Sequence, residues 1–269
     1  MTGNKPDRIR VRRNFEAGAV SYNHHARVQQ RVAQQLTEGI AGLTLPAGPI
    51  LEVGCGTGNL TRLLRLALPQ CRMLVLDLAG NMIRALDREL RKDGAVVADA
   101  RALPLATGSM ALVCAASVYQ WIPELPSAFG EAQRVLCPGG QFAFALFGRE
   151  TLWELREAYG EAARACGRPL PNHLLTLPTM AEVGRSLSDA GLTIRQLEQQ
   201  KEQDELDSVA DLVRSLKQIG AQTAGGREAG GLTSRRFWQE LEARYRRGFG
   251  HERGIPATYQ VIYGLAEKR

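Results

Sequence analysis

The sequence predicts an α/β fold in which helices cover both faces of a mostly parallel, doubly wound sheet. Short apolar runs alternate at a steady pace with amphipathic stretches between residues 49 and 147. Parallel strands need a crossover between them, usually a helix, so this alternation is typical of βαβ units. The length of 269 residues and the apolar fraction of 44% fit one large domain, or one domain with a small cap.

The first half of the chain carries the clearest elements. Val28, Val32, Leu36 and Ile40 recur every four residues, which predicts a helix beginning near residue 24. Five short apolar runs bounded by turn residues are predicted strands, at 49–53, 72–76, 95–98, 110–116 and 141–147. The helices predicted between them cover about 60–68, 81–90 and 127–136.

Beyond residue 148 the alternation loosens. A helical pattern covers 151–165, and Thr179 with Glu182 forms a capping box that opens a helix to residue 190. A further helix begins at Ser208, three residues before Asp211. Residues 194–198 and 257–265 are predicted strands.

Composition limits the setting in which the chain works. Residues 1–13 are polar and basic and lack the apolar core of a signal peptide, so we expect a frayed tail. No apolar run approaches the roughly 20 residues that span a bilayer, which favours a cytoplasmic protein without membrane contact. The five cysteines are far apart and the four histidines have no metal-ligand spacing. Free thiols and no metal are therefore expected.

The formal charge of +6 favours an acidic partner only mildly. Much of the excess lies in two basic clusters, at 5–13 (Lys5, Arg8, Arg10, Arg12 and Arg13) and at 235–247. Such runs are usually solvated helix faces; nucleic acid, an anionic substrate or an acidic carrier protein are the alternatives.

The main chemical signal is the segment Glu52-Val-Gly54-Cys55-Gly56-Thr-Gly58, which follows the first strand. Glycines at these positions let a strand-to-helix turn approach a ligand closely. The dinucleotide fingerprint is not met, because Asn59 stands where its third glycine belongs, and no Gly-Lys-Ser/Thr of a P-loop is present. The segment resembles the first motif of Rossmann-like class I methyltransferases. This resemblance implies that Glu52, Gly54, Cys55, Gly56 and Gly58 receive the amino-acid end of S-adenosylmethionine.

Two acidic strand ends extend the resemblance. Asp77 closes the second strand, where a carboxylate accepts hydrogen bonds from both ribose hydroxyls; in isolation it would equally be a helix cap. Asp99 and Ala100 stand at the adenine-edge position of the same family. Leu78 and Met82 are candidates for contact with the adenine ring, although either would also suit the core.

Four flanking segments carry a narrower resemblance, to the malonyl-[acyl-carrier protein] O-methyltransferases of biotin synthesis. They are the Ser-Tyr-Asn-His-His-Ala run at 21–26 with Gln29, the Tyr-Gln-Trp run at 119–121, and residues 146–155 and 256–264. Asn23 replaces the more common Asp of that family, and the Gly-Arg-Glu run at 148–150 is not its commonest version. The resemblance implies one methyltransferase domain over 14–269. Its sheet has seven mostly parallel strands, the last antiparallel, and cap insertions at about 148–178 and 221–254 roof the site.

The same resemblance implies methyl transfer from S-adenosylmethionine to the free carboxylate of malonyl held on a carrier protein. A carboxylate is already ionised at pH 7, so no general base is required. Malonyl-coenzyme A is the alternative acceptor. A nucleic-acid substrate is disfavoured, because the strand-four end lacks an Asn/Asp-Pro-Pro-Tyr/Phe motif. We expect a monomer.

Several residues receive roles from this resemblance. Tyr22 and Gln29 would close over the cofactor, although Tyr22 would also suit simple packing of its helix. Ser117 would contact the cofactor, and Gln120 and Trp121 would orient the substrate; Trp121 is equally consistent with a partly buried aromatic. Arg149 is the candidate for steering the malonyl carboxylate, although an exposed arginine at a strand end is common. The arginines of 235–247 would dock an acidic carrier.

Two other functions remain open on the sequence. One is methylation of a different small molecule. The other is a cofactor-binding assembly factor that transfers no methyl group.

Overall fold

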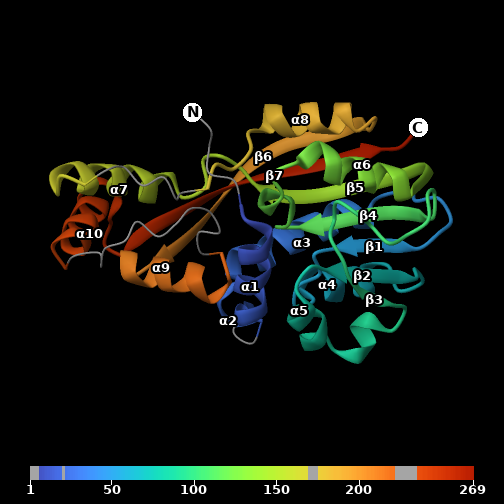
Figure 1. Ribbon diagram of the computed structural model, residues 1–269, viewed down its shortest axis with the longest axis horizontal. Coiled ribbons are helices and arrows are strands. Elements are labelled where there is room, and N and C mark those ends of the chain that lie inside the picture. Colours follow the sequence, from blue (N-terminus) through green and yellow to red (C-terminus); the bar gives the residue numbers. More distant parts are fainter. Residues whose placement is uncertain (1–5, 20–21, 169–174, 222–234) are drawn as a thin grey trace.

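The computed structural model describes residues 6–19, 22–168, 175–221 and 235–269. Its centre is a seven-stranded sheet in the order β3-β2-β1-β4-β5-β7-β6 (Figure 1). Strands β1 to β5 run parallel, and β7 is antiparallel to both β5 and β6. The strands are β1 (Ile50–Val53), β2 (Met73–Asp77), β3 (Ala95–Val97), β4 (Met110–Ala116), β5 (Leu136–Phe147), β6 (Thr193–Leu206) and β7 (Ile255–Glu267). The predicted sheet is confirmed.

Helices pack on both faces of this sheet, and each face has its own apolar core. On one face α3 (Arg27–Ala41) contributes the predicted stripe of Val28, Val32, Leu36 and Ile40, beside α4 (Asn59–Ala67). On the other face lie α6 (Leu125–Val135) and α8 (Met180–Asp189). The capping box that opens α8 is present as predicted.

Several elements differ in extent from the sequence prediction; strand β5, for example, begins at Leu136 rather than at 141. The predicted helix at 81–90 is divided into α5 (Gly80–Ala85) and the 3-10 helix η1 (Arg88–Arg91). Strand β6 extends well beyond the predicted 194–198. Most positions of β6 are polar, so apolar alternation identifies only part of this edge strand. Strand β6 nevertheless pairs with β7 along its length.

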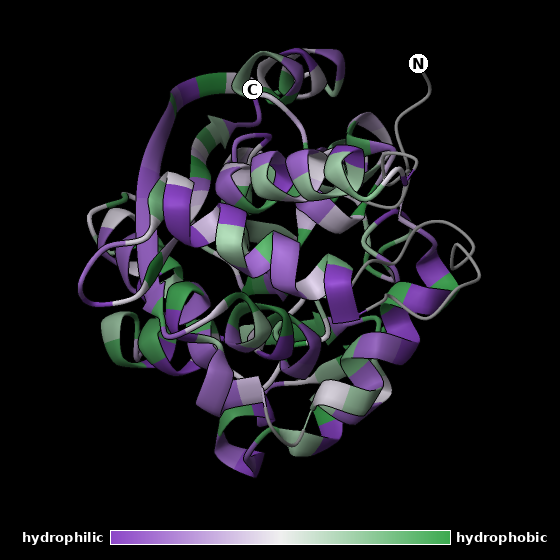
Figure 2. Ribbon diagram, turned by 90° about the vertical axis from the view of Figure 1, so that its left-hand side faces the viewer, coloured by the Kyte–Doolittle hydropathy of each residue, from purple (hydrophilic) through white to green (hydrophobic). Residues whose placement is uncertain are grey.

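The extension of β6 and β7 carries a helical end of the molecule. It consists of α7 (Trp153–Ala165), α9 (Val209–Gln218) and α10 (Arg235–Phe249), with α10 packed against α7 and β7. Figure 2 looks onto this end, where hydrophilic and hydrophobic residues alternate along the helices. The predicted cap insertions fall partly here, and their residues 169–174 and 222–234 lie outside the described residues. None of the described helices is long and apolar enough to cross a membrane.

The N-terminal segment corrects the expected tail. Residues Arg8–Gly18 form α1, capped by the Asp7 side chain, which accepts a hydrogen bond from Arg10 N at 2.8 Å. Val11 is buried, and α1 packs against α5. A second short helix, α2 (Tyr22–His25), leads into α3. The sequence analysis missed this helix because residues 8–13 are mostly basic. The apolar residues on its inner face are too few to give a recognisable helical period.

Candidate cofactor and substrate site

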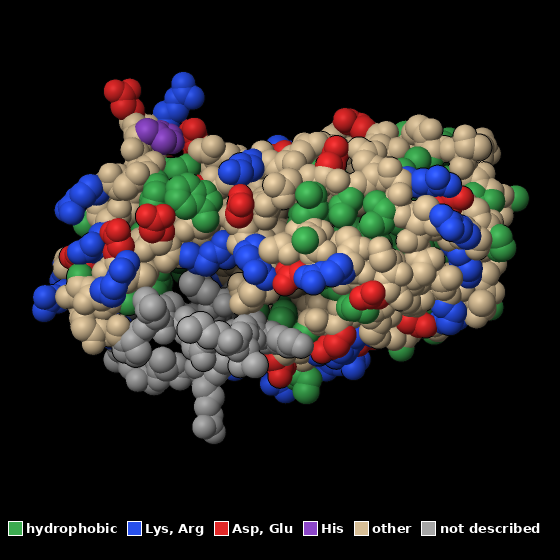
Figure 3. Space-filling model, turned by 90° about the horizontal axis from the view of Figure 1, so that it is seen from above, with side chains coloured by type: hydrophobic (Ala, Val, Ile, Leu, Met, Phe, Trp, Pro, Cys, Tyr) green, Lys and Arg blue, Asp and Glu red, His purple; other side chains and the backbone are tan. Residues whose placement is uncertain are grey.

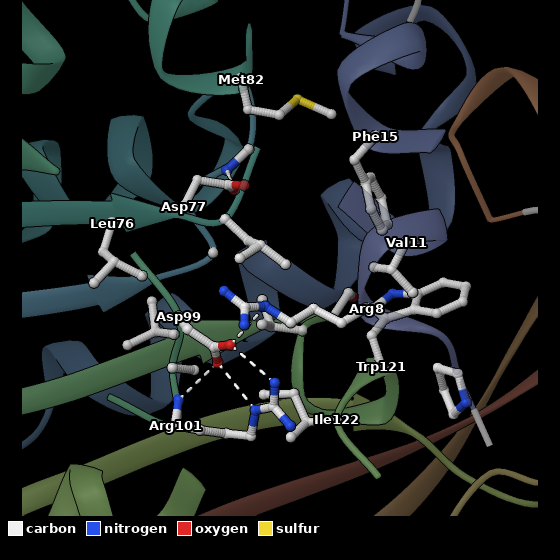
Figure 4. A pocket seen from close by; sticks show the side chains of 18 of the residues that line it. Arg8, Val11, Phe15, Leu76, Asp77, Met82, Asp99, Arg101, Trp121 and Ile122 are labelled. Carbon is white, nitrogen blue, oxygen red and sulfur yellow. Dashed lines mark hydrogen bonds and ion pairs between the residues drawn. The ribbon is translucent and has the colours of Figure 1, made fainter. Parts of the chain in front are cut away.

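A cavity of about 360 Å³ opens at the carboxyl ends of β1, β2 and β4, and α1 forms one of its walls (Figure 4). Ligands of open α/β sheets bind at this edge, where the strand order reverses. Ten of the predicted site residues line the cavity: Tyr22, Gly54, Gly56, Asp77, Leu78, Met82, Asp99, Ala100, Ser117 and Trp121.

The glycine-rich turn has the backbone conformation that its sequence requires. Gly54, Gly56 and Gly58 have φ angles of +69°, +52° and +91°. A Cβ on Gly54 would lie 2.3 Å from Val118 Cγ2, whereas a Cβ on Gly56 would meet nothing within 4 Å. Gly54 therefore permits close packing of the turn against the end of β4, and Gly56 leaves open space on the cavity side.

Asp77 joins the turn to the end of β2. Its Oδ2 accepts a hydrogen bond from Gly56 N at 2.9 Å, and its Oδ1 accepts one from Ala79 N at 2.8 Å. Burial raises the pKa of this carboxyl to about 6. The backbone hydrogen bonds lower the pKa, but burial has the larger effect. A ligand hydroxyl that donates to Asp77 would stabilise the ionised form further.

Asp99 is engaged by two arginines that sequence reasoning did not assign to the site. Arg101 Nη2 lies 3.0 Å and Arg8 Nε 2.9 Å from Asp99 Oδ2, and Arg101 also pairs with Glu124 at 3.0 Å. Partial burial would raise the pKa of Asp99, but the hydrogen bonds from Arg101 outweigh it and the pKa is lowered. Asp99 thus ties α1 to the cavity edge (Figure 4). The sequence indicated that Asp99 belongs to the site. Its two arginine partners could be identified only from the three-dimensional structure.

Aromatic side chains close the cavity beside α1. The Phe15 ring lies 5.5 Å from the Trp121 ring in an edge-on arrangement and 6.5 Å from the Tyr22 ring, between ring centroids. Burial raises the pKa of the Tyr22 hydroxyl, so it stays protonated at neutral pH. Trp121 lies on the 3-10 helix η2 (Tyr119–Trp121) and lines the cavity rather than the core.

Ser117 has an unusual environment at the end of β4. It has a positive φ of +60°, its N donates to Ala145 O at 2.8 Å, and Gln120 Nε2 donates to its carbonyl at 2.7 Å. Its buried hydroxyl has no hydrogen-bond partner among the described residues. A positive φ and a buried hydroxyl without a partner are unusual features of this turn, which lines the cavity. Gln120 itself does not line the cavity and acts by holding this turn.

Other predicted residues lie near the cavity without lining it. Gln29, Glu52, Cys55 and Gly58 are not among its lining residues. Glu52 is buried within β1, where burial raises the pKa of its carboxyl to about 8. Cys55 is buried, and burial raises the pKa of its thiol. Glu52, Cys55 and Gly58 belong to the strand end and the turn themselves, whereas Gln29 is a buried residue of α3.

Arg149 is the clearest departure from the sequence prediction. Its guanidinium pairs with Glu182 of the capping box at 3.0 Å and donates to Leu177 O at 3.3 Å. It does not line the cavity. Its side chain turns toward α8, and this position does not support the predicted role of steering the malonyl carboxylate.

We therefore expect Arg149→Ala to leave the KM for a malonyl carrier substrate within about twofold. The exposed ion pair with Glu182 contributes about 1 kcal/mol of stability at most. Steady-state kinetics beside Arg185→Ala, an exposed arginine on α8, provides the comparison. A tenfold rise in KM for Arg149→Ala alone would return Arg149 to the substrate site.

The residues present fit S-adenosylmethionine. The turn at Gly54 and Gly56 offers a cradle for its amino-acid end, and Asp77 offers an acceptor for its ribose hydroxyls. Leu78, Met82 and Ala100 are apolar lining for a flat ring. In the described part of the chain, no group of three or more His, Cys, Asp or Glu side chains is placed to hold a metal ion.

Comparison with known proteins identifies the class of enzyme to which this site belongs. A family model described as a methyltransferase domain matches residues 51–144. Geranyl diphosphate C-methyltransferase from Streptomyces coelicolor A3(2), solved with S-adenosyl-L-homocysteine, shares the fold with a TM-score of 0.53 at 15% identity, covering 91% of this chain and 82% of that chain. The fold, the glycine-rich turn and the matched domain define an S-adenosylmethionine-dependent class I methyltransferase.

Relatives along the whole chain define the family. The chain is 36% identical over 266 residues to the malonyl-[acyl-carrier protein] O-methyltransferase of Geobacter sulfurreducens, covering 97% of this chain and 99% of that relative. It is 34% identical to the biotin biosynthesis bifunctional protein BioHC of Saccharophagus degradans, covering 96% of this chain and 46% of that protein. The chain belongs to the malonyl-[acyl-carrier protein] O-methyltransferase family.

Proposed function

We propose that this enzyme transfers a methyl group from S-adenosylmethionine to the free carboxylate of malonyl-[acyl-carrier protein], which primes biotin synthesis. The observation that carries the proposal is a cavity with a cradle for the methyl donor and an apolar, aromatic wall, in a chain related over its full length to this family. Malonyl-coenzyme A is the second acceptor to test. We infer a monomer that works in the cytoplasm, where its five cysteines stay free.

The chain's own residues need to orient two reactants and exclude water. S-adenosylmethionine, when bound, supplies an electrophilic methyl group and a neutral thioether leaving group. The malonyl carboxylate has a pKa near 4 and attacks as the anion, so no proton is removed by the protein. No histidine or lysine occurs among the described residues that line the cavity. Phe15, Tyr22 and Trp121 would exclude water from the line of transfer.

The test is mass spectrometry of malonyl carrier protein after incubation with enzyme and S-adenosylmethionine. We expect a gain of one methyl group that mild ester hydrolysis removes, and no gain on acetyl carrier protein, which lacks the free carboxylate. Without a gain, and with cofactor binding measured separately, the malonyl assignment fails. A methyltransferase of another small molecule, or a binding protein without transfer, would then replace it.

Ser117 provides a test of the cofactor side. Ser117→Ala is expected to raise the Kd for S-adenosylmethionine about tenfold, because one hydrogen bond to a charged ligand group is lost. The melting temperature should not change, since the hydroxyl has no partner among the described residues. Calorimetric titration beside Ser188→Ala on the exposed face of α8 measures the difference. An unchanged Kd with a raised KM for the acceptor would assign the hydroxyl to the substrate instead.

A further inference from the structure

Helix α1 has two chemically different faces. Val11 and Phe15 lie one turn apart and line the cavity, and Gly18 is buried one turn further on. Arg10 and Arg13 are exposed on the rest of the helix. The apolar stripe fixes α1 against the site, so the arginines are held next to the cavity rather than on a frayed end.

The opening of the cavity lies beside this helix. Among the lining residues, Asp7, Arg8 and Glu124 have exposed side chains, so they mark where the cavity meets solvent. Arg8 is bound to Asp99, which fixes the first turn of α1 at this rim (Figure 4). An acceptor that reaches the methyl group from solvent passes the amino-terminal half of α1.

Positive charge exceeds negative charge around this half of the helix. Residues 8–13 contain four arginines and no acidic residue. Arg8 is balanced by Asp99, and Arg12 lies 3.8 Å from Glu16. Arg13 forms no ion pair with an acidic side chain in the described ranges, nor does Arg84 on the adjoining α5, which bonds to the neutral Asn81.

Helix α10 is less suitable for the same task, because it lies far from the cavity and two of its arginines are paired with acidic residues. Arg244 pairs with Glu240 at 2.7 Å and with Glu161 at 3.1 Å, and Arg246 pairs with Glu242 at 2.7 Å. No described residue of α7, α9 or α10 lines the cavity, and α10 lies at the far end of the molecule (Figure 1). Basic and acidic side chains are interspersed at that end in the view from above (Figure 3).

We propose that the arginine face of α1, formed by Arg10 and Arg13, is the docking surface for the acidic acyl carrier protein. The inference rests on the proposed function and adds the place where the partner binds. Malonyl travels on a tether of limited length, so the carrier must dock near the opening for the acceptor to reach the donor. Positive charge on α1, beside the opening, steers the acidic carrier and sets its orientation.

The experiment compares two charge reversals of equal size. Arg10→Glu/Arg13→Glu alters α1, and Arg236→Glu/Arg247→Glu alters exposed arginines of α10. Neither pair lines the cavity and all four side chains are exposed, so folding and cofactor affinity should persist. We expect the α1 pair to raise the KM for malonyl carrier protein at least tenfold with kcat unchanged. The α10 pair should stay within twofold.

Two further measurements separate docking from chemistry. Added salt should raise the KM of the wild type and have little effect on the α1 variant. Malonyl on free pantetheine, which has no protein surface, should be used equally by both. An unchanged KM in the α1 variant, or an equal rise in the α10 variant, overturns the proposal.

Direct binding of labelled carrier protein, followed by fluorescence anisotropy, keeps the two proposals distinguishable. Absence of turnover in the wild type counts against the proposed function alone. Weaker binding in the α1 variant than in the α10 variant supports docking on α1, and equal binding rejects it, whether or not methyl transfer is seen.

Discussion

Asp77→Ala is expected to weaken binding of S-adenosylmethionine at least about a hundredfold. The buried carboxylate would accept hydrogen bonds from two ribose hydroxyls, and each bond to a charged group contributes about 1.5–3 kcal/mol. Removal of the side chain also releases Gly56 N, which donates to Asp77 Oδ2 at 2.9 Å. Calorimetric titration measures the Kd. Asp87→Ala, which removes an exposed carboxylate between α5 and η1 that pairs with Arg62, is the control and should bind normally.

The pH dependence of this affinity tests the same residue in the wild type. The pKa of Asp77 is about 6 in the free protein because the carboxyl is buried. Bound ribose hydroxyls favour the ionised form, so affinity should fall as the pH drops below about 6. Binding near pH 6 should release a proton, which titrations in buffers of different ionisation enthalpy detect. Affinity that does not change between pH 5 and pH 8 would contradict the ribose role.

The same shift has a consequence for the stability of the free enzyme. The folded pKa of about 6 lies above the ordinary value of 3.8, so the folded state holds this proton more tightly than the unfolded chain. The resulting stability is full below about pH 4 and is lost as the pH rises through 6. Hydrogen bonds from the bound cofactor would compensate this loss at neutral pH.

Gly54→Ala is expected to lower the free energy of unfolding by about 2–5 kcal/mol and to abolish cofactor binding. The positive φ of +69° costs a side chain about 1–2 kcal/mol, and the Cβ would lie 2.3 Å from Val118. Overpacking adds about 1–3 kcal/mol. Urea unfolding followed by circular dichroism measures the change.

Gly56→Ala separates folding from binding in the same turn. Its Cβ meets nothing within 4 Å, so only the backbone strain of about 1–2 kcal/mol applies. The added methyl group occupies space on the cavity side, so the Kd for S-adenosylmethionine should rise at least tenfold in a folded protein. Gly130→Ala on α6, also without a close contact, is the control for the substitution itself. Normal cofactor affinity in Gly56→Ala would place the amino-acid end of the cofactor elsewhere.

Local patterns were sufficient for the parallel strands of the sheet and for the glycine-rich turn of the site. The spacing of apolar residues predicts strands and helices, because each element buries one face or both. Parallel strands joined by crossover connections allow only a few sheet topologies. The turn at Gly54 and Gly56 and the acidic end of β2 are also local, because positive φ angles and strand ends depend on neighbouring residues. Asp77 lines the cavity for that reason.

Contacts between distant segments were decided only by the tertiary structure. The bond between Arg8 and Asp99 joins residues that no periodicity connects, and it turns an expected tail into a wall of the site. Arg149 was expected at the substrate and instead pairs with Glu182. A long arginine side chain has several rotamers of similar energy, so its local sequence does not determine its ion-pair partner. The partner depends on which carboxylate the fold brings near. The sequence by itself determined the sheet, the turn and Asp77, whereas the three-dimensional packing decided which charges meet.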